Sequence, residues 1–144
     1  MQKDMPQKDF LLSRQARRCL MAAGISGVLG IGFGAFAAHG LARLGNPLIV
    51  EWVKTGASYQ LWHAAALLGL VGVAGRIASR WISAIGICFF VGSLLFAGSL
   101  YAMALLQWTW LGIITPIGGV IMILGWVLLI VAGGRMMGPA GKKA

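Results

Sequence analysis

The sequence predicts an all-α membrane protein in which four transmembrane helices form a compact antiparallel bundle with both termini in the cytoplasm. Composition, four long apolar runs and the placement of the cations lead to this fold class. Of the 144 residues, 59% are hydrophobic and only 10% are charged, and the mean hydropathy is +0.86. A soluble domain carries about 25% charged residues. This chain has too few charges to cover a water-facing surface, so its solvent is expected to be a lipid bilayer.

Four apolar runs have the length of membrane-spanning helices. They cover residues 19–38, 56–74, 82–106 and 111–132. Each is close to the roughly 20 residues that a helix needs to cross hydrocarbon. Helices are expected because backbone groups in lipid must be paired within their own segment. The first run ends near an Ala-Phe-Ala sequence that resembles a signal cleavage site, but the run is longer than a signal core, which indicates an uncleaved helix.

The lysine and arginine residues predict which ends of these runs face the cytoplasm. Cations are concentrated on the inner side because cytoplasmic loops carry the excess of positive charge. The predicted inner group is Lys3, Lys8, Arg14, Arg17, Arg18, Arg76, Arg80, Arg135, Lys142 and Lys143, and the outer group is Arg43 and Lys54. The sequence thus divides into a basic arm at 1–18, a membrane domain at 19–134 and a basic tail at 135–144. The expected location is the bacterial inner membrane.

Aromatic and capping residues agree with this arrangement. Tryptophans are typical of the boundary between lipid headgroups and hydrocarbon. They are found near the predicted outer ends at Trp52, Trp62, Trp108 and Trp110, and near an inner end at Trp81. Trp126 is deeper and is expected to pack between helices. Asn46 and Pro47 suit the cap and first position of a helix, so the segment that follows is either a separate interfacial helix or an extension of the second span.

Two features that suggest other classes of protein have simpler explanations. The net charge of +9 does not indicate a nucleic-acid partner, because the cations lie at the ends of apolar runs and not on one polar face. Cys19 and Cys88 lack a CxxC spacing or a second ligand nearby. They are expected to be free thiols that pack as small apolar side chains, and no cofactor is expected.

Small residues recur at every fourth position of the first run. Residues four apart are neighbours on a helix surface, and repeated small residues let helices approach closely in lipid. We expect these residues to form a helix-packing face, whose partner is a helix of the same chain or a second copy. They are Ala22, Ser26, Gly30, Gly34 and Ala38.

A polar group is predicted at the outer ends of the first two runs. Tyr59 and His63 share a helix face, and His39 closes the first run on the same side of the membrane. The candidate outer-leaflet cluster consists of His39, Tyr59, Gln60 and His63. Contact between the two histidines is not decided by the sequence. Ser99 and Tyr101 have no base and orienting group around them, so they are expected to bond to carbonyls or neighbouring helices.

Four motifs in order resemble one family of small membrane proteins. They are "GAFAAHGL" at 34–41, "WVKTGASYQLWHA" at 52–64, "GSLLFAGSLY" at 92–101, and "TPIGG" at 115–119 with "GW" at 125–126. The chain resembles the YgdD-type family, multi-pass membrane proteins of unknown function that are related to the eukaryotic transmembrane protein 256. The resemblance implies an integral inner-membrane protein with four spans. It implies no established catalytic or binding residue.

The sequence favours a structural or accessory protein that packs with itself or with a larger membrane complex. Interhelical hydrogen bonds would then be the role of the polar cluster. One alternative is a cofactor-binding protein in which His39 and His63 bind haem, quinone or a metal. Another is a small transporter. Ion and proton transporters use carboxylates inside their spans, whereas Asp4, Asp9 and Glu51 all lie outside the apolar runs. An enzyme is not expected.

Overall fold

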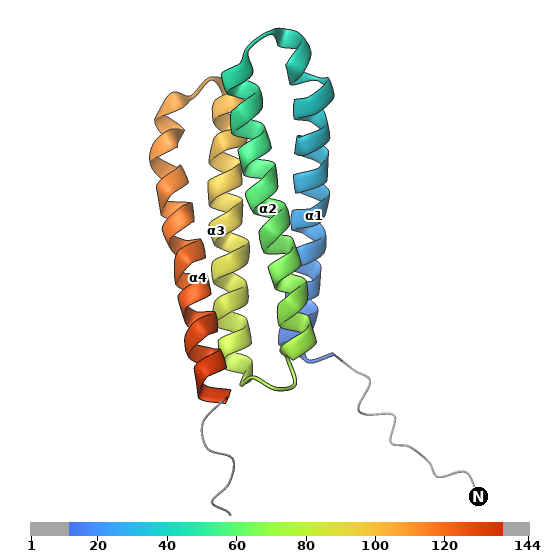
Figure 1. The fold of residues 1–144 in the computed structure, drawn as a ribbon, viewed down its shortest axis with the longest axis vertical. Coiled ribbons are helices and arrows are strands. Elements are labelled where there is room, and N and C mark those ends of the chain that lie inside the picture. The colour runs from blue at the N-terminus through green and yellow to red at the C-terminus, as the bar shows by residue number, and fades with distance from the viewer. Residues whose placement is uncertain (1–11, 137–144) are drawn as a thin grey trace, which may run out of the picture.

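The computed structural model describes residues 12–136 and consists of four long α-helices joined by short connections (Figure 1). This confirms the predicted all-helical class. The helices are α1 (Arg14–His39), α2 (Pro47–Val73), α3 (Ser79–Leu106) and α4 (Ile114–Met136), and two short 3-10 helices, η2 (Leu41–Leu44) and η3 (Thr109–Ile113), precede α2 and α4. Successive helices run in opposite directions. Predictions about residues 1–11 and 137–144 lie outside the described residues.

Three segments are long and apolar enough to cross a membrane. They are Arg14–Arg43, Ser79–Leu106 and Thr109–Arg135. The helix α2 is as long as its neighbours, with 27 residues, but it carries more polar side chains. Two of the most polar, Gln60 and His63, are buried inside the protein with exposed fractions of 0% and 4%. These two polar side chains are therefore directed toward other helices, whereas the charged Glu51 and Lys54 near the start of α2 are exposed.

Local capping determines where the first two helices begin. The Oγ of Ser13 accepts a hydrogen bond from the backbone nitrogen of Ala16 at 3.2 Å, so α1 starts at Arg14. Residues 14–18, which the sequence analysis placed in the arm, are thus helical. The side chain of Asn46 accepts from the nitrogen of Leu48 at 3.1 Å, and Pro47 occupies the first helical turn. This confirms the predicted cap, and the segment after Pro47 is an extension of the second long helix.

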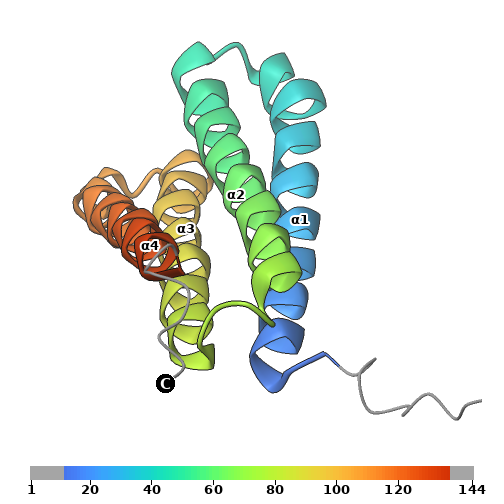
Figure 2. The same cartoon turned by 60° about the horizontal axis from the view of Figure 1, so that its bottom comes forward.

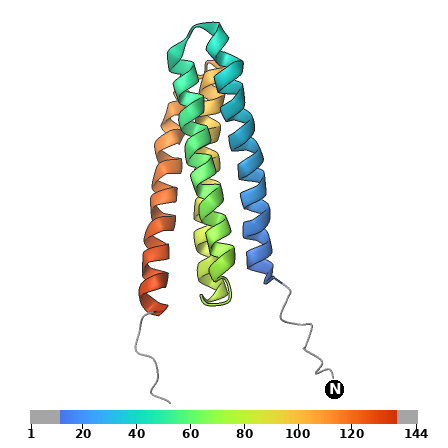
Figure 3. The same cartoon turned by 45° about the vertical axis from the view of Figure 1, so that its right-hand side comes forward.

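The four helices form an antiparallel bundle in which not every helix neighbours the others. Among residues 12–136, α1, α2 and α3 pack against one another, whereas the backbone of α4 lies close to α3 and η3 alone. Figure 2 shows α4 on the far side of α3 from α1, and Figure 3 shows the same splayed arrangement from another side. Within residues 12–136, no backbone of α4 closely approaches α1 or α2. The bundle is therefore three packed helices with a fourth on one flank.

Glycines explain why α3 and α4 pack so closely. A methyl group built at Gly118 would lie 2.5 Å from the backbone nitrogen of Phe96 and 2.8 Å from the carbonyl oxygen of Gly92. One built at Gly92 would lie 2.9 Å from the nitrogen of Met122. Only residues without a Cβ let two helix backbones approach to this distance. α4 is held on α3 by this pair of glycines.

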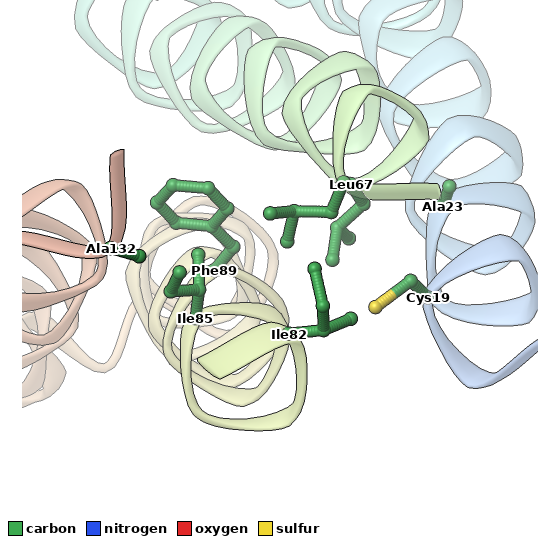
Figure 4. Close-up of a cluster of buried hydrophobic side chains, with 8 residues drawn as sticks. Cys19, Ala23, Leu67, Ile82, Ile85, Phe89 and Ala132 are labelled. Atoms are coloured by element: carbon green, nitrogen blue, oxygen red, sulfur yellow. The ribbon is translucent and has the colours of Figure 1, made fainter. Parts of the chain in front are cut away.

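Apolar side chains from all four helices meet near the end where the chain enters α1. Leu67, Ile82, Ile85 and Phe89 are fully buried there, each with an exposed fraction of 0%. Figure 4 shows Ile82 of α3 beside Cys19 of α1, Leu67 of α2 facing the side chains of α3, and Ala132 of α4 beside Phe89. Moving an apolar side chain from lipid into the protein interior changes its free energy little. In a membrane, such contacts therefore stabilise the fold through close van der Waals packing.

Candidate functional site

His63 is the best-connected member of the predicted polar cluster. Its Nδ1 donates to the carbonyl oxygen of Tyr59 at 2.8 Å, and its Nε2 accepts from the indole Nε1 of Trp126 at 3.2 Å. A carbonyl only accepts and an indole N–H only donates. These partners select the neutral ring with its proton on Nδ1. The ring also packs edge-on against Phe89, with ring centroids 5.3 Å apart. Both nitrogens of His63 are thus used to connect groups of this protein.

His63 lies well inside α2. Because α2 begins at Pro47, His63 is 16 residues into the helix, about 24 Å along its axis. His39 is the last residue of α1 and is exposed. The end of α1 lies beside the start of α2 (Figure 1), so the two histidines are at different levels. Trp126, and not His39, is the partner of His63.

Gln60 forms a second link, between α2 and α3. Its Oε1 accepts a hydrogen bond from the hydroxyl of Tyr101 at 2.9 Å, and both side chains are buried. Phe33 of α1 stacks on the ring of Tyr101, with centroids 3.8 Å apart and planes 12° from parallel. The Nε2 of Gln60 is buried and has no hydrogen-bond partner among the described residues. Three helices therefore meet at one amide–phenol bond.

Tyr59 faces outward, unlike its two neighbours in the cluster. Its side chain is 37% exposed and contacts Trp62 and Phe96, with ring centroids 4.9 and 4.7 Å apart. It lines an open groove of about 710 Å³ along α2, together with Trp62, Glu51 and Lys54. This groove is broad and lies on the surface, so it does not form an enclosed site.

Ser99 and Thr115 connect α3 to α4 near the other end. The Ser99 hydroxyl donates to the carbonyl oxygen of Phe96 at 2.9 Å and lies 2.7 Å from the Thr115 hydroxyl. Since the single Ser99 proton is used on Phe96, Thr115 is the donor in that second contact. The sequence analysis expected Ser99 and Tyr101 to bond to carbonyls or neighbouring helices, and these bonds confirm it.

The small residues of α1 lie along a line that winds slowly around the helix axis. Ser26 and Gly30 are buried, Ala22 and Gly34 are half-buried, and Ala38 is exposed. A step of four residues overshoots one turn of 3.6 residues by about 40°, so five such residues cannot keep one face. The closest approach is at Gly30, where an added methyl group would lie 2.8 Å from Cγ of Leu61. Ala37 takes the buried place at the end of the helix, with an exposed fraction of 0%.

The chemistry available to these residues is hydrogen bonding between helices. No group of three His, Cys, Asp or Glu side chains within residues 12–136 is placed to hold a metal ion. A metal bound at His63 Nε2 would have to displace the indole of Trp126. The geometry therefore favours a fixed internal link over a ligand.

Comparison with known proteins places the chain in a family. The family described as "Protein of unknown function (DUF423)" matches residues 33–119, which is more than half of the chain. The chain belongs to this family. The UPF0382 inner membrane protein YgdD of Escherichia coli (strain K12) is 36% identical over 121 residues, which cover 84% of this chain and 92% of that protein. The UPF0382 membrane protein SAB0533 of Staphylococcus aureus (strain bovine RF122 / ET3-1) is 39% identical over 114 residues, covering 78% and 92%. No solved structure matches.

Membership of this family confirms the resemblance that the sequence motifs indicated. The chain is a membrane protein of a family whose function is unknown. The motifs hold most of the residues that join helices: Gly56, Gln60, His63, Gly92, Ser99, Tyr101, Thr115, Gly118 and Trp126. The sequence analysis did not pair Tyr101 with Gln60 or Trp126 with His63. The spacing within one helix gives no distance to another, and only their shared polarity in apolar runs pointed to them.

Proposed function

We propose that this protein is a four-span integral membrane protein of the bacterial inner membrane with a structural or accessory role, and with no catalytic activity of its own. The observation that carries the proposal is the use of the interior polar groups. Both nitrogens of His63, the oxygen of Gln60 and the hydroxyl of Ser99 bond to other groups of the same protein. A transport or catalytic site needs polar groups that are free to meet a substrate.

The crossing of α2 is supported by its position and by the direction of its polar residues. α2 packs alongside both α1 and α3 (Figure 1), and each of those neighbours is long and apolar enough to span. A helix packed along two spanning helices shares their depth. Its buried Gln60 and His63 do not face lipid, which removes the main penalty on a polar span.

The cytoplasmic placement of both ends is supported by the charge at one end of the bundle. The start of α1, the α2–α3 connection and the end of α4 lie together (Figure 1). Among the described residues, that end carries Arg14, Arg17, Arg18, Arg76, Arg80 and Arg135, whereas the opposite end carries Arg43 and Lys54. Positive loops remain in the cytoplasm during insertion.

A packing role is supported by the open flank of α4. Among the described elements, the backbone of α4 lies close only to α3 and η3, and Trp126 adds one side-chain bond to α2. The outward face of α4 is therefore available to another helix. The large side chains on that face include Val120, Ile123 and Ile130, with exposed fractions of 65%, 63% and 73%. The partner is either a second copy of the chain or a subunit of a larger membrane complex.

The oligomeric state in mild detergent tests this role. The full chain, expressed in bacteria and extracted gently, is expected in a discrete particle larger than the 15.2 kDa monomer. Replacing Ile123 by Trp on the open face should disperse this particle, whereas Ile31→Trp, similarly exposed on α1, serves as the control. A monomer that carries a stoichiometric substrate or cofactor would contradict the accessory role and favour transport or cofactor binding.

A further inference from the structure

We propose that the groove between the first turns of α1 and the facing turns of α3 binds one anionic phospholipid. The groove has a volume of about 300 Å³ and is lined only by these two helices. This is the lower end of the range for small-molecule sites. The inference does not depend on the proposed accessory role, because it concerns a site on the side of the bundle away from α4 (Figure 2).

The groove changes from polar to apolar along its length. Gln15, Arg18 and Ser83 lie at the end nearest the helix starts, and Ile25, Ile87 and Val91 lie deeper. The three deeper side chains are 49%, 62% and 38% exposed, so they present apolar surface along an open channel. A phospholipid has the same order of parts, with a polar headgroup followed by hydrocarbon chains. The headgroup fits beside Arg18 and a chain fits along the apolar part.

The charge around the groove selects an anionic headgroup over a zwitterionic one. Arg14, Arg17 and Arg80 lie near Arg18 in the first turns of α1 and α3. The only carboxylate within residues 12–136 is Glu51, at the opposite end of the bundle. A zwitterionic headgroup would bring its amine close to these cations, with no carboxylate to bind it. Basic pockets between helices on the cytoplasmic side are suited to anionic lipids.

The groove remains open because the side chains between α1 and α3 are small. Ala22 and Gly86 line it, and a methyl group built at Gly86 would lie 2.8 Å from Sγ of Cys19. Cys19 is itself buried in the apolar cluster of Figure 4. The floor of the groove is therefore formed by packed core, and the walls are fixed by the helices. A site with a rigid floor and a charged mouth is preorganised for its ligand.

Native mass spectrometry of the full chain in detergent tests the proposal. Dioleoyl phosphatidylglycerol is titrated against dioleoyl phosphatidylcholine, and one tightly bound phosphatidylglycerol is expected. Arg18→Gln should weaken its binding about fivefold, since one cation at an anionic surface contributes about that factor. Arg17→Gln is the matched control, because it removes the same charge from the same helix turn but Arg17 does not line the groove. It should change the affinity less than about twofold.

Three results would overturn the proposal. Equal losses in Arg18→Gln and Arg17→Gln would show that only general surface charge attracts the lipid. Phosphatidylcholine bound as tightly as phosphatidylglycerol would remove the charge selection. Displacement of the lipid by an equal concentration of glycerol phosphate would reveal a phosphate site that does not use the apolar part. Arg18 is exposed, so its substitution leaves the fold intact and each comparison can be read.

Discussion

The indole Nε1–H of Trp126 donates to Nε2 of His63 across two helices whose backbones do not pack together. Phe89 of α3 packs against both rings, with its centroid 5.3 Å from that of His63 and 4.8 Å from that of Trp126. The bond is therefore a side-chain bridge from α2 to α4 over α3. It restricts α4 on the one flank where the bundle is otherwise open.

Removing this bridge should destabilise the protein. Trp126→Phe keeps an aromatic ring against Phe89 but removes the donor, and His63→Ala removes the acceptor. Interhelical hydrogen bonds in membranes contribute about 0.6 to 2 kcal/mol, so each variant should lower the thermal midpoint in detergent. Trp108→Phe is the control, because Trp108 is 52% exposed and lies outside the bridge.

The double variant distinguishes a direct bond from two separate effects. If His63 and Trp126 act through one bond, the combined loss should be smaller than the sum of the single losses. Strict additivity of the two unfolding free energies would contradict the bridge.

Gly118 should tolerate no side chain. In Gly118→Ala, the new methyl group meets the backbone of Phe96 at 2.5 Å, and backbone cannot move aside without separating α3 from α4. Overpacking of this kind costs about 1 to 3 kcal/mol, which thermal unfolding in detergent measures. In the adjacent Gly119→Ala, the nearest atom is 4.0 Å away, so stability should be unchanged or slightly higher. Similar melting of the two variants would exclude the close approach.

The effect of removing the Tyr101 hydroxyl on stability should depend on whether Gln60 is present. Tyr101→Phe leaves both polar atoms of the buried Gln60 amide unpaired, and a buried polar group without a partner costs about 1 to 3 kcal/mol. Adding Gln60→Leu removes the amide and should restore much of the loss. Unfolding of the two variants in the same detergent measures this. A double variant less stable than Tyr101→Phe would show that Gln60 has another role.

Replacing His39 should affect the free energy of unfolding much less than replacing His63. His39 is exposed at the end of α1, so His39→Ala should change the free energy of unfolding by less than about 0.5 kcal/mol. The purified protein should also lack the visible absorbance band of haem. A haem band that disappears in His39→Ala or His63→Ala would restore the cofactor hypothesis in place of the structural one.

Composition and cation placement were enough to predict the four helices, their alternating direction and the cap at Asn46. These features depend on local sequence, because apolar length and side-chain capping act within one segment. The apolar run of the second span was predicted to begin at Gly56, and the segment from Pro47 was left as either a separate interfacial helix or an extension of that span. The structure shows the extension, which the sequence could not decide because the cap at Asn46 is compatible with both.

The contacts between helices could not be predicted from the sequence. Gln60, His63, Tyr101 and Trp126 all stand out as polar or amphipathic groups in apolar runs, yet the pairing of His63 with Trp126 depends on how α4 leans on α3. The glycines Gly92 and Gly118 set that lean, and their spacing within each helix does not reveal that they face each other. For the same reason, the position of α4 on one flank of the bundle could not be predicted.

Cysteine labelling in intact bacteria measures whether α2 crosses the membrane. Ala42→Cys and Gly75→Cys, made with Cys19 and Cys88 replaced by alanine, place one thiol at each end of α2. Both positions are exposed, and a methyl group at Gly75 meets no atom within 4 Å. A membrane-impermeant thiol reagent should label position 42 in intact cells and position 75 only after the membrane is opened. Labelling of position 75 in intact cells would show that α2 does not cross.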